Sequence, residues 1–234
     1  MITPTSLFAE SCSSQWDKLL QSNDIPERYI HLKGYCGVSL KNKLWDVIKG
    51  NLYFDYKKVR AEFFSRIDNV DGYVCSVYTD LCVKTEGIPD ALIMNCEHSW
   101  PQSLGAIGKA KSDLHHLFPV ESPVNSKRSN KPFCEVNDPT WERDGSYFGW
   151  SSYGTECFEP PTRHKGDLAR AMLYFSIRYS KPLDIEQETF FKKWNKEDPV
   201  SSKEYLRNED IAEFQKNRNP FIDAPVLVDL ISDF

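Results

Sequence analysis

Hydrophobic side chains recur every three or four residues in several stretches of the chain, which is typical of helices with one buried face. Before residue 50, such a face is formed by Leu40, Leu44, Val47 and Ile48. Further helices are expected over residues 56–67 and near residues 187–195 and 202–217. The most regular face follows Arg163 and consists of Leu168, Met172, Phe175 and Tyr179. These patterns predict a chain that is mainly helical.

The middle of the chain also predicts strands. Residues 91–96 form an apolar run that leads into Glu97 and His98. Residues 114–118 predict a second strand and residues 72–78 a short one. Residues 137–161 contain Asn-Asp-Pro, Asp-Gly and Pro-Pro, and we expect them to be rich in loops.

A short helix is expected after the second of these strands. Ser122 suits its N-cap, Pro123 suits its first helical position, and Lys131-Pro132 should end it. Residues 91–131 therefore predict a strand, a loop, a strand and a short helix in that order. With the helices on either side, this unit predicts an α+β fold.

The composition fits one globular domain. Of the 234 residues, 40% are hydrophobic, which is enough for one sizeable core, so a single domain over residues 1–234 is expected. The 14 Phe, 11 Tyr and 6 Trp argue against disorder. No apolar run approaches the length that crosses a bilayer, so we expect no membrane partner. We also expect a monomer.

The net charge of −5 argues mildly against a nucleic-acid partner, because phosphate binding depends on basic patches. The distribution of charge matters more than the sum. Residues 105–133 carry five basic and two acidic side chains, a local charge of +3. The basic ones are Lys109, Lys111, Lys127, Arg128 and Lys131.

The seven cysteines are scattered and form no C-x-x-C pair. They are compatible with disulfides in an exported protein, in which an odd number leaves at least one unpaired or paired between chains. They are equally compatible with buried free thiols in a cytosolic protein. The first fifteen residues lack the basic and apolar regions of an export signal. Either the protein has no such signal or the signal is absent from this chain.

Three side chains in the strand–strand–helix unit point to a metal-assisted reaction. Glu97 and His98 would face opposite sides of a regular strand, so they share one site only if the strand ends there, which Trp100-Pro101 favours. Asn125 falls in the first turn of the short helix, and Arg128 shares its helix face. Glu and Asn oxygens suit Mg²⁺, and histidine is a good base for water near neutral pH.

These residues lie within motifs that resemble the bacterial endonuclease I family. The motifs are Glu-His-Ser-Trp-Pro-Gln-Ser at 97–103, Ser-Asp-Leu-His-His-Leu-Phe-Pro at 112–119 and Val-Asn-Ser-Lys-Arg-Ser-Asn at 124–130. Others are Phe-Glu-Pro-Pro at 158–161, Lys-Gly-Asp-Leu-Ala-Arg-Ala at 165–171 and Arg-Asn-Pro-Phe-Ile-Asp at 218–223, and a weaker match covers residues 34–48. Several linked motifs in the same order make the resemblance specific.

The resemblance implies a ββα-metal (His-Me finger) core at about residues 91–131 and a metal-dependent endonuclease without sequence preference. Such enzymes cleave DNA, and often RNA, and we expect 5′-phosphate and 3′-hydroxyl ends. Glu97 and Asn125 would hold Mg²⁺, which Mn²⁺ should replace, and His98 would be the general base. A nonspecific nuclease endangers its own genome, so we expect a secreted or periplasmic protein.

The cation that contacts the scissile phosphate stays open. Some relatives supply an arginine from a longer loop between the two strands, whereas the loop here holds only Lys109 and Lys111. The candidates for substrate binding are Arg128, Lys109 and Arg163, and His116 is a further one. His115 and His116 should alternate along their strand, one inward and one outward.

Two other functions and one other site remain open. The chain could be an inactive nucleic-acid-binding module of the same fold, or a sequence-specific HNH-like nuclease. Cys96, His98, His115 and His116 could instead form a zinc site, although their spacing matches no standard zinc motif.

Overall fold

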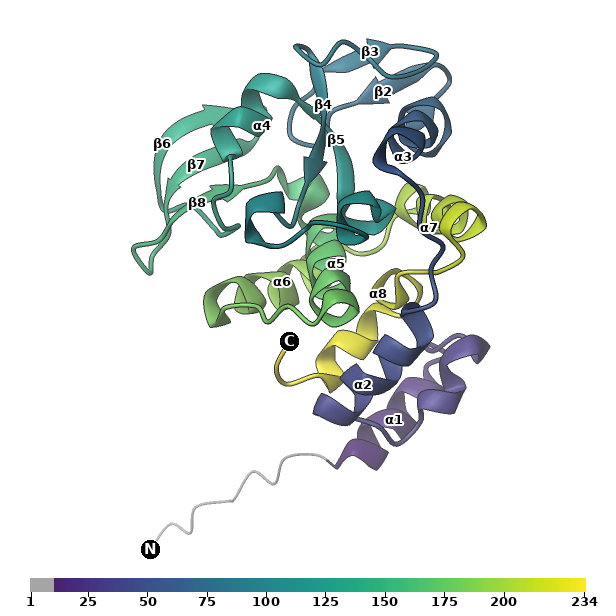
Figure 1. Cartoon of the computed structure of the whole chain (residues 1–234). Helices are drawn as coiled ribbons and strands as arrows, with labels where there is room; N and C mark the ends of the chain where they lie inside the picture. The colour runs from purple at the N-terminus through teal and green to yellow at the C-terminus, as the bar shows by residue number, and fades with distance from the viewer. Residues whose placement is uncertain (1–10) are drawn as a thin grey trace, which may run out of the picture.

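The computed structural model describes residues 11–234 and combines helices with three small sheets (Figure 1). Its α-helices are α1 (Cys12–Gln21), α2 (Gly37–Ile48), α3 (Tyr56–Glu62), α4 (Ser122–Arg128), α5 (Thr162–Tyr179), α6 (Ile185–Glu197), α7 (Ser202–Gln215) and α8 (Pro220–Asp223). Its strands are β1 (Asn69–Val70), β2 (Tyr73–Cys75), β3 (Cys82–Lys84), β4 (Met94–His98), β5 (Leu117–Glu121), β6 (Asp138–Arg143), β7 (Ser146–Trp150) and β8 (Glu156–Glu159). The expected α+β class is confirmed.

The long helix α5 lies at the centre of the larger hydrophobic core, with α6, α2 and α8 against it (Figure 1). Of its predicted apolar face, Leu168, Met172 and Phe175 are buried and Tyr179 is half-buried. A second core lies under α3, β4 and α7 and includes Val59, Met94 and Ile211. The helix predicted over residues 56–67 is present as α3 and continues as one π-helical segment, Phe63–Ile67.

β4, β5 and α4 follow one another as the sequence predicts. β4 and β5 pair antiparallel, with Glu97 opposite Phe118 and His98 opposite Leu117. α4 begins immediately after β5, and the Ser122 N–H donates to the carbonyl of Ile93 before β4. The first turn of α4 therefore lies beside the two strands, as Figure 1 shows.

The prediction of loops over residues 137–161 is wrong, because β6, β7 and β8 form an antiparallel sheet there. Asp144 and Gly145 both have positive φ, and they close a two-residue hairpin between the paired residues Arg143 and Ser146. The Asp-Gly pair was thus a hairpin signal rather than a loop signal. A Cβ at Gly149 would lie 2.1 Å from the Asp138 carbonyl oxygen, so only glycine lets β6 and β7 approach this closely.

Two local predictions near the short helix are also wrong. Residues 114–116 form a 3-10 turn, η5 (Leu114–His116), and the strand begins only at Leu117 and runs through Pro119. His115 and His116 are consequently both buried, instead of alternating between core and surface. Ser122 is the first helical residue and not the N-cap, and its hydroxyl donates to the carbonyl of Ala91.

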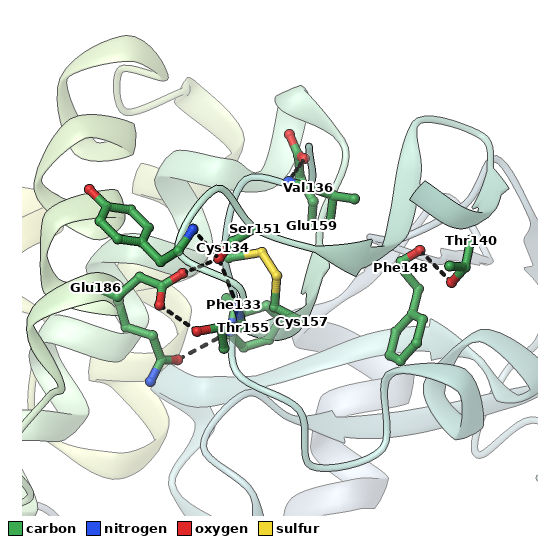
Figure 2. Close-up of a disulfide and its surroundings, with 12 residues drawn as sticks. Phe133, Cys134, Val136, Thr140, Phe148, Ser151, Thr155, Cys157, Glu159 and Glu186 are labelled. Carbon is green, nitrogen blue, oxygen red and sulfur yellow. Dashed lines mark hydrogen bonds between the residues drawn. A yellow bond between two sulfur atoms is a disulfide. The ribbon is translucent and has the colours of Figure 1, made fainter. Parts of the chain in front are cut away.

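Six cysteines form disulfides, which join Cys12 to Cys36, Cys75 to Cys82 and Cys134 to Cys157. Of the two interpretations that the sequence left open, the structure supports disulfides, and the unpaired seventh cysteine is the buried Cys96. Figure 2 shows the Cys134–Cys157 bridge beside Phe133, where it joins the segment after α4 to β8. This bridge fixes the chain immediately downstream of α4.

We expect non-reducing alkylation to label one cysteine, Cys96, when the native-purified protein is unfolded in the presence of the reagent. The same treatment after reduction should label all seven cysteines, and peptide mass spectrometry would locate each label. Replacing Cys134 and Cys157 together by serine should lower the free energy of unfolding by about 3 kcal/mol, because the bridge restricts the unfolded chain. Seven labels without reductant would contradict the disulfide assignment.

The N-terminal residues 1–10, on which part of the export-signal question rests, lie outside the described residues. Within residues 11–234, every helix is too short or too polar to cross a bilayer.

Candidate active site

A cavity of about 420 Å³ opens where β4 ends beside α4. Its walls come from four parts of the chain: β4 supplies residues 95–98, the loop after β4 supplies residues 101–103, α4 and the segment after it supply Asn125, Arg128 and residues 129–130, and α3 supplies Tyr56. Glu97 and His98 line the same cavity, because β4 ends at His98 and Pro101 follows. The structure therefore brings Glu97, His98 and Asn125 together.

The His98 ring is held by backbone and is neutral. Its Nε2 lies 3.0 Å from the carbonyl oxygen of Lys111, and a carbonyl only accepts, so Nε2 carries the proton. Nδ1 is therefore the basic nitrogen, and the Gln102 side-chain amide lies 3.4 Å from it. Burial, and then the neighbouring His116, lower the pKa of His98 to about 3. Because the imidazole is neutral and its proton is on Nε2, Nδ1 can accept a proton directly.

The Glu97 carboxylate is buried in the wall of the cavity, with 3% of the residue exposed. Its Oε1 accepts a hydrogen bond from the Tyr78 hydroxyl at 3.1 Å and lies 2.9 Å from Nη1 of Arg128. Burial raises the pKa of Glu97, and the Arg128 guanidinium opposes that shift. Both contacts are made by Oε1, so neither of them occupies the second carboxylate oxygen, Oε2.

Arg128 lies beneath the site rather than on a nucleic-acid-facing surface. The residue is 2% exposed, and besides the ion pair with Glu97 it donates to the carbonyls of His98 at 3.2 Å and Ser99 at 2.7 Å. Its guanidinium also covers the Phe133 ring, 4.2 Å from the ring centre. Arg128 shares a helix face with Asn125 as predicted, but that face points inward. Its geometry is that of a residue that positions Glu97 and the end of β4.

The other predicted substrate-binding residues lie outside the cavity wall. Lys109 is exposed, two residues before Lys111. Arg163 lines a different cavity and pairs with Asp80 at 3.0 Å. His116 is fully buried behind His98, and its Nε2 lies 2.7 Å from the Ala110 carbonyl oxygen. The His116 ring lies 5.5 Å from the His98 ring, centre to centre, and is not exposed at the surface.

Oxygen donors dominate the part of the cavity where a metal ion would bind. The Glu97 carboxylate and the half-buried Asn125 amide line one wall, and hard oxygen donors with remaining water ligands suit Mg²⁺. The zinc alternative lacks support, because Nε2 of His115 and Nε2 of His116 lie against the Asn217 and Ala110 carbonyls. Within residues 11–234, no group of three His, Cys, Asp or Glu residues has a metal-binding arrangement.

Three residues of the site had no assigned role in the sequence. Gln102 lies inside the 97–103 motif, so its place beside His98 could have been suspected from that spacing. Tyr78 and Tyr56 come from segments far upstream and carry no local signal. Tyr78 follows β2, which contacts β5, and Tyr56 begins α3, which contacts residues 110–112. These tertiary contacts bring the two tyrosines to the site.

Comparisons with known proteins agree with the geometry. The sequence model of the family described as Endonuclease I matches residues 35–226. The chain is 32% identical to an extracellular ribonuclease of Bacillus amyloliquefaciens, over 97% of this chain and 84% of the relative. It is 31% identical to an extracellular ribonuclease of Bacillus subtilis (strain 168), over 89% and 79%. An extracellular deoxyribonuclease of Aeromonas hydrophila is 33% identical over 48% of this chain and 50% of its own length.

The match to the family covers most of the chain and includes Glu97, His98 and Asn125. The two Bacillus relatives extend the similarity over nearly the whole sequence. On this evidence, the chain belongs to the endonuclease I family.

Proposed function

We propose that the protein is a secreted, metal-dependent endonuclease that hydrolyses phosphodiester bonds in nucleic acids without sequence preference. One observation carries the proposal: a neutral histidine, with its basic Nδ1 free of any backbone partner, shares a cavity with the oxygen donors Glu97 and Asn125. The pairing of β4 and β5 with α4 supports the assignment of this unit as a ββα-metal core.

His98 would act as the general base. Nδ1 accepts a proton from a water molecule, while Nε2 keeps its hydrogen bond to the Lys111 carbonyl and fixes the ring. The oxygen of that water forms a bond to phosphorus as the bond from phosphorus to the 3′ oxygen breaks. The leaving oxygen takes a proton from solvent, so the products are a 5′-phosphate and a 3′-hydroxyl.

Glu97 and Asn125 would hold Mg²⁺, with Mn²⁺ as a substitute. Such an ion, when bound, neutralises the charge that develops on the phosphate oxygens. Arg128 and Tyr78 hold Glu97 through Oε1, so the carboxylate cannot swing away from the cavity. Arg128 also holds the carbonyl of His98 itself, which links the proposed metal ligand and the proposed base through one buried side chain.

The relatives suggest both kinds of nucleic acid as substrates. Those that cover nearly the whole chain are named ribonucleases, and one that covers about half of it is named a deoxyribonuclease. The residues of the site recognise a phosphodiester and its attacking water, features that DNA and RNA share. Extracellular relatives and three disulfides favour secretion.

The proposal predicts that chelation with EDTA stops cleavage and that Mg²⁺ or Mn²⁺ restores it. A supercoiled plasmid, an unrelated linear DNA and a structured RNA would be incubated with the protein across these metals. The Glu97→Gln variant should need at least roughly 10–100-fold more metal for half-maximal rate, because it loses an anionic ligand and the loss of a partner that only orients a ligand already costs that much. Undiminished cleavage after exhaustive chelation would overturn the metal site.

The same experiment separates the alternatives. An inactive binding module would retain DNA without cutting it under any metal. A sequence-specific enzyme would yield discrete fragments from one DNA and none from another. End-labelling of the products, with and without prior phosphatase, would show whether the phosphate remains on the 5′ end.

A further inference from the structure

The residues assigned so far do not include the cations that must bind the phosphates of the substrate. Binding a nucleic acid needs cations that contact phosphate, and an acidic protein must supply them locally. Arg128 is buried in an ion pair, and Arg163 is paired with Asp80 in another cavity. The cavity therefore needs another source of positive charge.

Arg60 on α3 is the one arginine for which residues 11–234 provide no hydrogen-bond or ion-pair partner. All ten arginines lie within residues 11–234, and the other nine each form an ion pair or a hydrogen bond. The buried Nε of Arg60 has no acceptor, which is an unfavourable state for a charged donor. Its guanidinium carbon lies 6.0 Å from the ring centre of Tyr56, which lines the cavity.

Lys111 approaches Tyr56 as well. Its Nζ lies 4.7 Å from the centre of the Tyr56 ring, and within the described part of the chain no carboxylate is within ion-pair distance of it. Its own carbonyl accepts the hydrogen bond from His98 Nε2. Lys111 therefore provides both the ammonium near Tyr56 and the carbonyl that holds His98, so the positions of the two groups are linked.

Tyr56 connects these two cations to the cavity. Its ring lies 5.5 Å from the His98 ring, centre to centre, and α3 lies against the short helix η4 (Ala110–Ser112) that contains Lys111. Tyr56 and Arg60 are four residues apart on α3 and so share a face of that helix. One side of the cavity is thus an aromatic ring flanked by two positive charges.

We propose that Tyr56, Arg60 and Lys111 form a cationic wall that binds the phosphate backbone of the nucleic acid next to the scissile bond. The inference rests on the proposed nuclease function and names the residues that hold its substrate. Arg60 is half-buried, and a phosphate can reach its two Nη groups, which have no partner among residues 11–234. The planar guanidinium can donate two parallel hydrogen bonds to a phosphate. Contacts of this kind read the backbone and not the base edges, which accounts for cleavage without sequence preference.

The test is the salt dependence of DNA binding, measured by fluorescence anisotropy of a labelled duplex with Ca²⁺ in place of Mg²⁺ to prevent turnover. Each lost phosphate contact should flatten the log–log salt slope by about 0.9 and weaken binding about eightfold at 0.1 M salt. We expect this result for Arg60→Gln and for Lys111→Gln separately. Arg60→Lys and Lys111→Arg keep the charge and should retain the wild-type slope.

Lys43→Gln is the matched control, since Lys43 lies on α2, 5.2 Å from the centre of the Tyr35 ring, and does not line the cavity. It removes the same charge from a similar cation–aromatic pair and should leave the slope unchanged. Thermal unfolding of each variant shows that the fold is retained. Wild-type slope and affinity in both glutamine variants would overturn the cationic wall while leaving the nuclease proposal intact. Failure of the wild-type protein to cleave any nucleic acid would instead overturn the function on which the wall rests.

Discussion

Replacing His98 by alanine should reduce the rate of plasmid cleavage by roughly 10²–10⁴-fold, the usual contribution of a positioned general base. The substitution removes Nδ1, the nitrogen that can accept a proton from water. It leaves Glu97 and Asn125 in place, so binding of DNA in Ca²⁺ should change little. Initial rates of nicking in saturating Mg²⁺, compared with affinities in Ca²⁺, would separate the two effects.

His31→Ala is the matched control, because His31 is exposed and lies outside the cavity wall. It should cleave at the wild-type rate. Added imidazole should partly restore cleavage to His98→Ala, since it fits the space the side chain leaves, and should not affect His31→Ala. A rate for His98→Ala within threefold of wild type would remove His98 from the mechanism.

The strand–strand–helix unit was predictable because its signals are local. The apolar run before Glu97, the turn residues between the strands and Pro123 at the start of α4 each act over a few residues. The order of the motifs then placed Asn125 near Glu97 and His98 without any knowledge of the rest of the fold. The exact ends were less predictable: β5 runs through Pro119, which the sequence suggested as its end.

Depth below the surface was not predictable from helical spacing. Arg128 follows Asn125 by three residues, and this spacing correctly places both on one face of α4. Spacing says which residues share a face but not what lies opposite that face. Here it meets the buried Glu97, so a side chain that looked like a phosphate contact forms an internal ion pair.

Long-range contributions to the site had no sequence signal at all. Tyr56 lies about forty residues before His98, in a helix whose apolar residues indicate only that it is amphipathic. Its place in the cavity depends on how α3 lies against η4, a contact between segments that carry no shared motif. The unpartnered state of Arg60 is likewise a property of the folded surroundings, because it depends on where every acidic side chain ends up.

Replacing Arg128 by methionine should lower the free energy of unfolding by about 3–5 kcal/mol, the usual cost of removing one partner from a buried ion pair. Methionine fills much of the same space, but Glu97 is left as a buried charge without its cation. The carbonyls of His98 and Ser99 also lose the donor that holds the end of β4. Urea denaturation followed by tryptophan fluorescence would give the change.

Arg163→Met provides the comparison, since it breaks the exposed pair with Asp80 and should cost no more than about 1 kcal/mol. Adding Glu97→Gln to Arg128→Met removes the stranded charge, so the double variant should be less destabilised than the sum of the two single variants. Because Arg128 faces inward, Arg128→Met should leave the salt slope of DNA binding unchanged at temperatures where it is folded, in contrast to Arg60→Gln. A stability loss below about 1 kcal/mol for Arg128→Met, or strict additivity in the double variant, would show that the Glu97–Arg128 pair does not stabilise the site as a unit.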